Sequence, residues 1–319
     1  MAPAPLLGGL RPRHLLARMP TPIQRLPRLS AMLGAQIFCK RDDLTGFGFG
    51  GNKIRKLEYL LHEATDAGCD CLVTCGSNQS NWCCMVSVAG AVLGLDAYLV
   101  LGGPVPELDT GNIRLERLAG ARITHVDTGE DSVLEDGCRD LTASLEARGR
   151  HPYRMVMGGS NGLGSLGYVD ALREVIEYER AAQIRFSKIF HATGSGGTQA
   201  GLVAGSVLES WQGDIVGIAV SRSREEQSAK VGAILADMFG THDTKVIVDD
   251  AFVGGGYRQK SDACAEALEI FARVEGIFLD EVYTGKAAAG LIEYGRSGRL
   301  HGDEHVLFLH TGGTAQLFE

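Results

Sequence analysis

The sequence lacks the features that mark membrane-spanning, nucleic-acid-binding and metal-binding proteins. None of its apolar runs reaches the roughly 18 residues that cross a bilayer. Its net charge is −8 and the sequence contains no block of like charges, which argues against a nucleic-acid or membrane partner. Its eight cysteines form no paired C-x-x-C spacing, which argues against a metal site and a disulfide framework. We therefore expect a cytoplasmic protein with reduced thiols and small-molecule ligands.

Acidic side chains are absent from residues 1–40, although this segment carries several arginines. Such a composition is typical of a transit peptide. Pro20, Pro22 and Pro27 would interrupt a long amphipathic helix, however, and a strand-like run follows at 36–40. We expect a basic arm that packs on the folded domain.

The chain is long enough to bury a large core, with 319 residues of which 45% are hydrophobic and 22% charged. Short apolar runs alternate with amphipathic segments that have helical spacing. These further strand-like runs are 71–75, 97–101, 122–126, 153–157, 188–192, 215–220, 245–248 and 305–309. The alternation predicts an α/β fold with parallel sheets covered by helices on both faces.

The run Gly50-Gly51-Asn52-Lys53 precedes an amphipathic helix that we expect to begin near Ile54. The glycines allow a tight turn with positive φ. The positive end of a helix dipole and partial burial both favour the neutral, nucleophilic form of Lys53, which makes it a candidate for a Schiff base with an aldehyde. The alternative is a solvated lysine in a first helical turn.

A second glycine-rich turn, Thr193-Gly194-Ser195-Gly196-Gly197-Thr198, stands between a predicted strand and a predicted helix. Consecutive backbone N–H groups in such a turn bind phosphate, and Ser195 and Thr198 add hydroxyl donors. The turn matches neither the P-loop pattern nor G-x-G-x-x-G, so a ligand with a single phosphate fits better than ATP or NAD. A tight turn without a ligand is the alternative.

Three further turns follow predicted strands. Gly76-Ser77-Asn78-Gln79-Ser80-Asn81 places polar side chains at a helix start, where they either cap the helix or bind a carboxylate. Tyr283-Thr284-Gly285-Lys286 and His310-Thr311-Gly312-Gly313-Thr314 come late in the chain. Because ligands bind at the carboxyl ends of parallel strands, we expect the turns to converge on one site.

A candidate Schiff-base lysine, a monophosphate cradle and a carboxylate-sized polar turn together describe a pyridoxal phosphate (PLP) enzyme acting on amino acids. The chain resembles the family of D-cysteine desulfhydrases and 1-aminocyclopropane-1-carboxylate (ACC) deaminases from about Pro20 onward. The motifs that carry the resemblance are Pro20-Thr21-Pro22, Lys40-Arg41-Asp42-Asp43, Gly50-Gly51-Asn52-Lys53, Arg55-Lys56-Leu57-Glu58, Gln79-Ser80-Asn81, Gly194-Ser195-Gly196-Gly197-Thr198, Val282-Tyr283-Thr284-Gly285-Lys286-Ala287 and His310-Thr311-Gly312-Gly313.

This resemblance implies the two-domain PLP fold type II, also called the tryptophan synthase β-like fold. A large PLP-binding domain would comprise residues 1–53 and 160–319, and a smaller α/β domain residues 54–159. The active site would lie in the cleft between them, and the protein would be a homodimer.

The resemblance also implies roles for individual residues. Lys53 would hold PLP and move the Cα proton, and Tyr283 and Tyr257 would face the substrate as further catalytic residues. The implied cofactor-binding residues are Lys53, Asn81, Gly194, Ser195, Gly196, Gly197, Thr198 and Thr311. The implied substrate-binding residues are Gln79, Ser80, Asn81 and Thr284.

The reaction is narrowed by Thr284, which stands where ACC deaminases have an acid. A neutral hydroxyl near the pyridine nitrogen makes a weaker electron sink, which suits α,β-elimination of a good leaving group better than opening a cyclopropane ring. D-cysteine, giving pyruvate, hydrogen sulfide and ammonia, is the first candidate substrate. The alternatives are an L-cysteate sulfo-lyase, an ACC deaminase that gives 2-oxobutanoate and ammonia, and a PLP-binding protein without lyase activity.

The sequence departs from the family pattern in three places, one of which is Asn78, where relatives commonly have an aliphatic residue before Gln-Ser-Asn. Trp82 stands where relatives usually have His or Gln. The run Tyr257-Arg258-Gln259-Lys260 is more basic than in relatives. Its two cations are either part of a solvated loop or a guide for an anionic substrate group such as a sulfonate or a second carboxylate.

Overall fold

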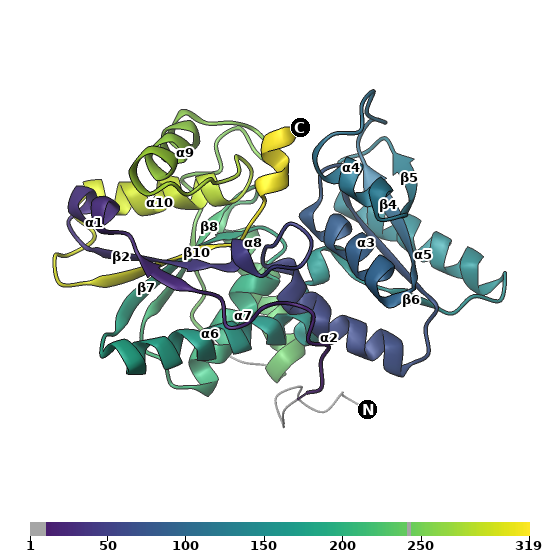
Figure 1. Ribbon diagram of the computed structural model, residues 1–319, viewed down its shortest axis with the longest axis horizontal. Helices are drawn as coiled ribbons and strands as arrows, with labels where there is room; N and C mark the ends of the chain where they lie inside the picture. The colour runs from purple at the N-terminus through teal and green to yellow at the C-terminus, as the bar shows by residue number, and fades with distance from the viewer. Residues whose placement is uncertain (1–10, 241–243) are drawn as a thin grey trace.

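Two helix-covered sheets make up the computed structural model, which describes residues 11–240 and 244–319 (Figure 1). Residues 1–10, which the predicted large domain includes, lie outside the described residues. The larger sheet has six strands in the order β1-β2-β10-β7-β8-β9, and only the β1–β2 pair is antiparallel. Its strands are β1 (Ile23–Arg25), β2 (Gln36–Arg41), β7 (Phe186–Thr193), β8 (Asp214–Ala219), β9 (Ile247–Asp249) and β10 (His305–His310).

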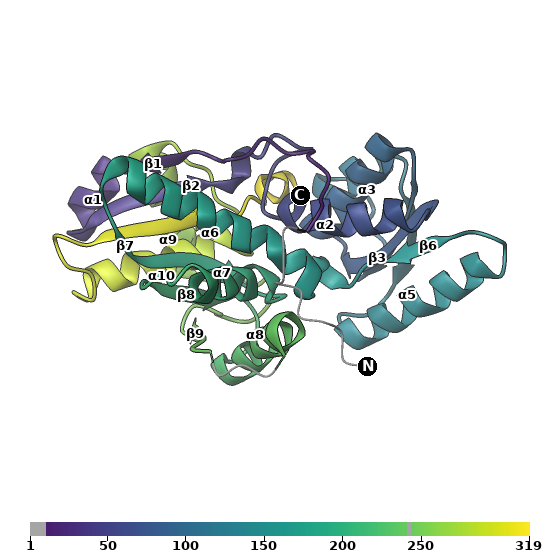
Figure 2. The same ribbon diagram turned by 90° about the horizontal axis from the view of Figure 1, so that it is seen from below.

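Both faces of the six-stranded sheet are buried. Val306 and Phe308 of β10 pack into the core that α1, α9 and α10 cover, and Leu307 and Leu309 pack into the core that α6, α7 and α8 cover. Figure 1 shows α9 and α10 above the sheet and α6 and α7 below it, and Figure 2 shows the lower layer. These helices are α1 (Pro27–Leu33), α6 (Gly162–Ala182), α7 (Gly197–Leu208), α8 (Arg224–Phe239), α9 (Asp262–Glu275) and α10 (Thr284–Arg296). Because helices cover both faces, the central strands β7, β8 and β10 are largely buried and read as nearly continuous apolar runs.

The smaller sheet is entirely parallel, in the order β5-β4-β3-β6. Leu72 and Leu99 pack against α2, α3 and α4, whereas Val73 and Val100 pack against α5. The elements are α2 (Lys53–Asp66), β3 (Cys71–Ser77), α3 (Asn81–Leu93), β4 (Asp96–Gly102), α4 (Gly111–Leu118), β5 (Arg122–Val126), α5 (Asp131–Glu146) and β6 (Pro152–Arg154). Three short 3-10 helices complete the described chain: η1 (Asp42–Leu44), η2 (Met157–Gly159) and η3 (Thr314–Phe318). The predicted α/β class with helix-flanked parallel sheets is confirmed.

Each strand-like run predicted from the sequence overlaps a strand of the structure. Strand β1 was not predicted, because its 3 residues lie between Pro22 and Pro27 and are too few to show an alternating pattern. The four strands of the smaller sheet fall within residues 54–159. The exact division into two domains stays a prediction.

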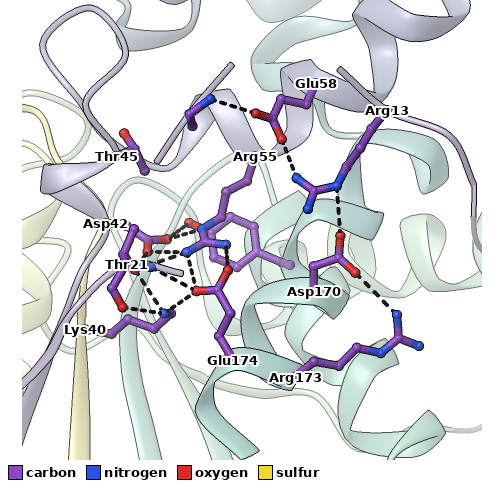
Figure 3. Close-up of polar contacts among 12 residues, drawn as sticks. Arg13, Thr21, Lys40, Asp42, Thr45, Arg55, Glu58, Asp170, Arg173 and Glu174 are labelled. Atoms are coloured by element: carbon purple, nitrogen blue, oxygen red, sulfur yellow. Dashed lines mark hydrogen bonds and ion pairs between the residues drawn. The ribbon is translucent and has the colours of Figure 1, made fainter. Parts of the chain in front are cut away.

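A buried ionic network fixes α2 to the larger sheet (Figure 3). The Arg55 guanidinium lies 2.8 Å from a carboxylate oxygen of Asp42 and 2.7 Å from one of Glu174. The Lys40 ammonium lies 2.6 Å from the same Glu174 carboxylate. Burial opposes the charge of Asp42, but the positive charges of Arg55 and Lys40 outweigh it and lower the Asp42 pKa to about 2. The first turn of α2 is thereby held in one orientation.

The basic arm that precedes β1 packs on α2 in its described part. Arg13 forms an ion pair with Glu58, and the backbone N–H groups of Leu16 and Ala17 donate to the same carboxylate at 2.7 and 2.9 Å.

All eight cysteines are free thiols. Among the described helices, none is both long and apolar enough to cross a membrane.

Candidate active site

A cavity of about 1180 Å³ opens between the two sheets. It lies where strands of both sheets end, since residues that end or follow β3, β7, β8 and β10 all line it. The predicted site residues that line it are Lys53, Ser80, Asn81, Gly194, Ser195, Gly196, Thr198, Tyr257, Tyr283 and Thr311. Turns distant in the sequence therefore meet at the carboxyl ends of parallel strands, where α/β proteins bind ligands.

Three predicted site residues do not line the cavity. The Gln79 side chain donates to the Thr110 carbonyl at 3.2 Å and accepts from the Asn112 N–H at 2.7 Å. The fully buried Thr284 hydroxyl donates to the Asp280 carboxylate at 2.6 Å. Gly197 is the first residue of α7, directly behind the cavity-lining Gly196. The functional roles of all three stay predictions.

Lys53 begins α2 after a turn that only glycine accommodates easily. Gly50 has φ of 76°, and a Cβ there would lie 1.9 Å from the Asp43 carbonyl oxygen. Gly51 follows with φ of 111°. Burial lowers the pKa of Lys53 to about 8. At pH 7 about one-tenth of such a lysine is neutral, against roughly one part in 3,000 for an ordinary lysine.

Lys56, one turn further along α2, lies behind the glycine-rich turn and was not among the predicted site residues. It is fully buried, and its ammonium donates to the Ser160 hydroxyl at 3.1 Å. The Ser160 hydroxyl in turn donates to Ser195 of the glycine-rich turn at 2.7 Å. Burial and the neighbouring charge of Lys53 hold the Lys56 pKa well below its ordinary value. The spacing of three residues, which places two side chains on one side of a helix, was the signal available in the sequence.

The glycine-rich turn and its surroundings fit a phosphate monoester. Gly196, with φ of 89°, leads into the first residue of α7. A Cβ on Gly197 would lie 2.8 Å from the Lys56 ammonium, so the backbone and this cation approach closely. Asn52, also missed from the sequence, donates to the Thr198 hydroxyl at 3.0 Å and joins the turn to the start of α2. Helix N–H groups, hydroxyls and a buried cation are the donors that bind a phosphate.

A pair of tyrosines closes another side of the cavity. The Tyr257 and Tyr283 hydroxyl oxygens are 2.6 Å apart, and that of Tyr257 is 3.3 Å from the Ser77 hydroxyl at the end of β3. Burial and the neighbouring Tyr257 raise the Tyr283 pKa well above its ordinary value. Tyr283 is therefore neutral, with a proton to donate, at physiological pH.

The start of α3 supplies further polar groups of the cavity wall. Ser80 caps the helix by accepting from the Cys83 N–H at 3.2 Å, and its neighbour Asn81 accepts from the Asn112 amide at 2.8 Å. Trp82 is almost fully buried and donates from its indole N–H to the Thr74 hydroxyl at 2.7 Å. The capping alternative for Ser80 is thus realised, while Ser80 and Asn81 also face the cavity.

A partly neutral lysine and a phosphate cradle that line one cavity, at the carboxyl ends of parallel strands from two sheets, are the features of PLP-dependent enzymes with fold type II. Residues 15–312 match the family model described as pyridoxal-phosphate dependent enzyme, and the chain belongs to this family. The predicted cofactor is thereby confirmed, as is the predicted class, a PLP-dependent lyase.

Solved structures agree with this assignment. One described as an ACC deaminase homologue is 39% identical, and the two superpose with a TM-score of 0.89. The alignment covers 96% of this chain and 93% of the homologue's chain. A fungal L-serine ammonia-lyase from Rhizomucor miehei shares the fold at 18% identity, with coverages of 95% and 96% and a TM-score of 0.71. A hydrogen sulfide-producing enzyme from Fusobacterium nucleatum does so at 16% identity, with coverages of 92% and 96% and a TM-score of 0.67.

Proposed function

We propose that the protein catalyses α,β-elimination from β-substituted alanines, with D-cysteine as the first candidate substrate. D-cysteine and one water would give pyruvate, hydrogen sulfide and ammonium. The observation that carries the proposal is Lys53, a lysine with a pKa of about 8 on the cavity wall that also holds a phosphate cradle. A neutral amine at this position is the base that removal of the Cα proton needs.

The other residues around Lys53 would bind the cofactor and the substrate. PLP, when bound, supplies an electron sink for the charge that develops at Cα. Gly194 to Thr198, supported by Lys56, would bind its phosphate, and Thr311 would lie near its pyridine nitrogen. Asn81 would bind its ring oxygen, and Ser80 the substrate carboxylate at the start of α3.

The protonated hydroxyl of Tyr283 is suited to donate a proton or a hydrogen bond to the departing sulfur. The bond between Cβ and sulfur breaks, and its electron pair leaves with the sulfur. The released 2-aminoacrylate then takes up water and yields pyruvate and ammonium. Gln79 and Thr284, whose side chains are bonded away from the cavity, would orient the turns that carry Ser80 and Tyr283.

Two alternative substrates each have an observation in their favour. ACC, opened to 2-oxobutanoate and ammonium, is favoured by the 39% identity to an ACC deaminase homologue. L-cysteate is favoured by Arg258, which lines the cavity. We also propose a cytoplasmic homodimer, supported by the family resemblance and by the free thiols. Light scattering of the purified protein would measure its mass.

The direct test is release of sulfide and pyruvate from D-cysteine by the PLP-loaded protein, with L-cysteine and ACC assayed alongside. We expect D-selective release. The Lys53→Ala variant should lose at least about a thousandfold in kcat and the visible absorbance of covalently held PLP. A yellow, active Lys53→Ala variant would overturn the assignment of Lys53. Visible absorbance without turnover of any β-substituted alanine would favour a PLP-binding protein without lyase activity.

A further inference from the structure

Arg258 is a cavity-lining arginine in an uncommon backbone conformation. It lies in the loop between β9 and α9, with φ of 59°. Left-handed backbone is unfavourable for a residue with a long side chain and persists only where the surroundings hold it. Such positions cluster at ligand-binding sites.

Two sets of contacts fix the loop. The fully buried Lys286 ammonium donates to the carbonyl oxygens of Val253 and Gly256 at 2.8 and 2.7 Å. Tyr257 contacts the Tyr283 hydroxyl on one side and the Ser77 hydroxyl on the other. Arg258 is therefore anchored next to the tyrosine pair. Its positive charge also acts on Tyr283, where it partly offsets the rise in pKa that burial causes.

The two terminal nitrogens of the Arg258 guanidinium have different surroundings. Nη2 donates to the Glu319 carboxylate at 2.5 Å. Nη1 is shielded from solvent and has no hydrogen-bond partner within residues 11–240 and 244–319. A buried charged N–H without a partner is unfavourable, and a bound acceptor would satisfy it. Because a guanidinium offers paired donors in a plane, it suits a carboxylate or a sulfonate.

Lys260, two residues further on, differs in each respect. Its side chain is 76% exposed and its ammonium pairs with Glu281 at the surface. It does not appear among the residues that line the cavity. The structure therefore separates the two cations that the sequence presents together.

We propose that Arg258 forms a second anion subsite, which binds a sulfonate or carboxylate on the β-carbon side of the substrate. This inference rests on the proposed function, because the α-carboxylate is assigned to the start of α3 on the other lobe. With L-cysteate and one water, elimination would give pyruvate, ammonium and hydrogen sulfite. The Cβ–S bond breaks and its electron pair leaves with sulfite, whose negative charge Arg258 faces.

The subsite can be tested by binding alone. The probes are 3-sulfopropanoate, which is cysteate without its amino group, and butanoate, which has a methyl in place of the sulfonate. Calorimetric titration of the PLP-loaded protein should show that Arg258→Gln weakens 3-sulfopropanoate about 10- to 100-fold and changes butanoate less than about twofold. Arg258→Lys, which keeps the charge but not the fork, should recover part of the loss.

Lys260→Gln is the matched control, since it removes the same charge from the same loop, and it should leave both affinities unchanged. Equal weakening of both probes by Arg258→Gln would overturn the subsite, and so would no change or a wild-type protein that binds no 3-sulfopropanoate. Arg258-dependent binding by a protein that releases no pyruvate would support the subsite and overturn only the proposed elimination.

Discussion

Helix α2 carries two kinds of cation within its first turn, where Arg55 and Lys56 are buried and Lys53 is half-buried. Arg55 is surrounded by the carboxylates of Asp42 and Glu174. Lys53 lines the cavity, whereas Lys56 is fully buried and donates to Ser160 beside the glycine-rich turn; neither has a carboxylate partner among the described residues. The cation that fixes the helix is thus paired with carboxylates, whereas the two lysines near the proposed chemistry are not, and Lys56 contacts only the Gly158 carbonyl and the Ser160 hydroxyl among the described residues.

The different partners change the protonation of these groups in opposite directions. Burial opposes the charge of Arg55, but its carboxylate partners dominate and raise its pKa well above the ordinary value. Burial without such partners lowers the pKa of both lysines. The paired set, which comprises Arg55 and Lys40 with Asp42 and Glu174, should therefore govern stability. The unpaired set, Lys53 and Lys56, should govern cofactor binding. Variants can test the two sets separately.

The largest effect is expected from breaking the paired set. Asp42→Ala removes an acceptor shared by Thr21, Arg55 and Tyr168 and leaves part of the Arg55 charge uncompensated. The free energy of unfolding should fall by about 3–5 kcal/mol, measured by urea denaturation. Lys245→Ala, at a pair whose lysine is 76% exposed, should cost less than about 1 kcal/mol. Equal losses would contradict the structural role of the network.

The next largest effect concerns Lys56 and cofactor affinity. Lys56→Met should weaken PLP binding about 10- to 100-fold and leave the stability of the apoprotein unchanged or higher, because an unpaired buried charge is removed. Lys40→Met, at a lysine paired with Glu174, should lower the stability of the apoprotein and leave its PLP affinity unchanged. Equilibrium dialysis with PLP and urea denaturation measure the two effects. A destabilised Lys56→Met variant with normal PLP affinity would refute the comparison.

A smaller effect is expected in the pH dependence of reconstitution. Only the neutral amine of Lys53 attacks the PLP aldehyde, and its lowered pKa of about 8 makes that form abundant at a lower pH. The rate of PLP attachment to the apoprotein should rise about tenfold per pH unit below pH 8 and level off above it. Stopped-flow absorbance gives this profile. A rise that continues to about pH 10.5 would show that Lys53 is solvated.

The smallest effect concerns an unpaired buried acid, Glu116 of α4. It is fully buried, both carboxylate oxygens lack a partner among the described residues, and burial raises its pKa to about 9. In the unfolded chain it ionises above about pH 4.5, while the folded protein keeps the proton up to about pH 9, so stability falls across this interval. Glu116→Gln should raise Tm by about 2 °C at pH 8 and by less at pH 5.

Differential scanning calorimetry of the apoprotein at the two pH values would measure this change. Glu177→Gln, at an exposed position of α6, is the control and should shift Tm little at either pH. A loss of stability at pH 8 on replacing Glu116 would mean that its carboxylate is ionised and bound in the folded protein.

The sequence alone determined the succession of strands and turns along the chain, and it predicted a candidate site at the carboxyl ends of the strands. Apolar runs, glycine turns and helix starts are local signals, and parallel strands bring successive turns to one edge of a sheet. Lys53 and the turn at residues 193–198 were found in this way. The missing strand β1 was too short to show a pattern.

The partners of individual side chains were decided only by the tertiary structure. Thr284 bonds to Asp280 and Gln79 to Asn112, although both stand in motifs that predict contact with a ligand. Arg258 reaches the cavity and Lys260 does not. Desolvation and hydrogen-bond geometry depend on which distant segments pack together, and residue type and spacing along the chain do not specify them.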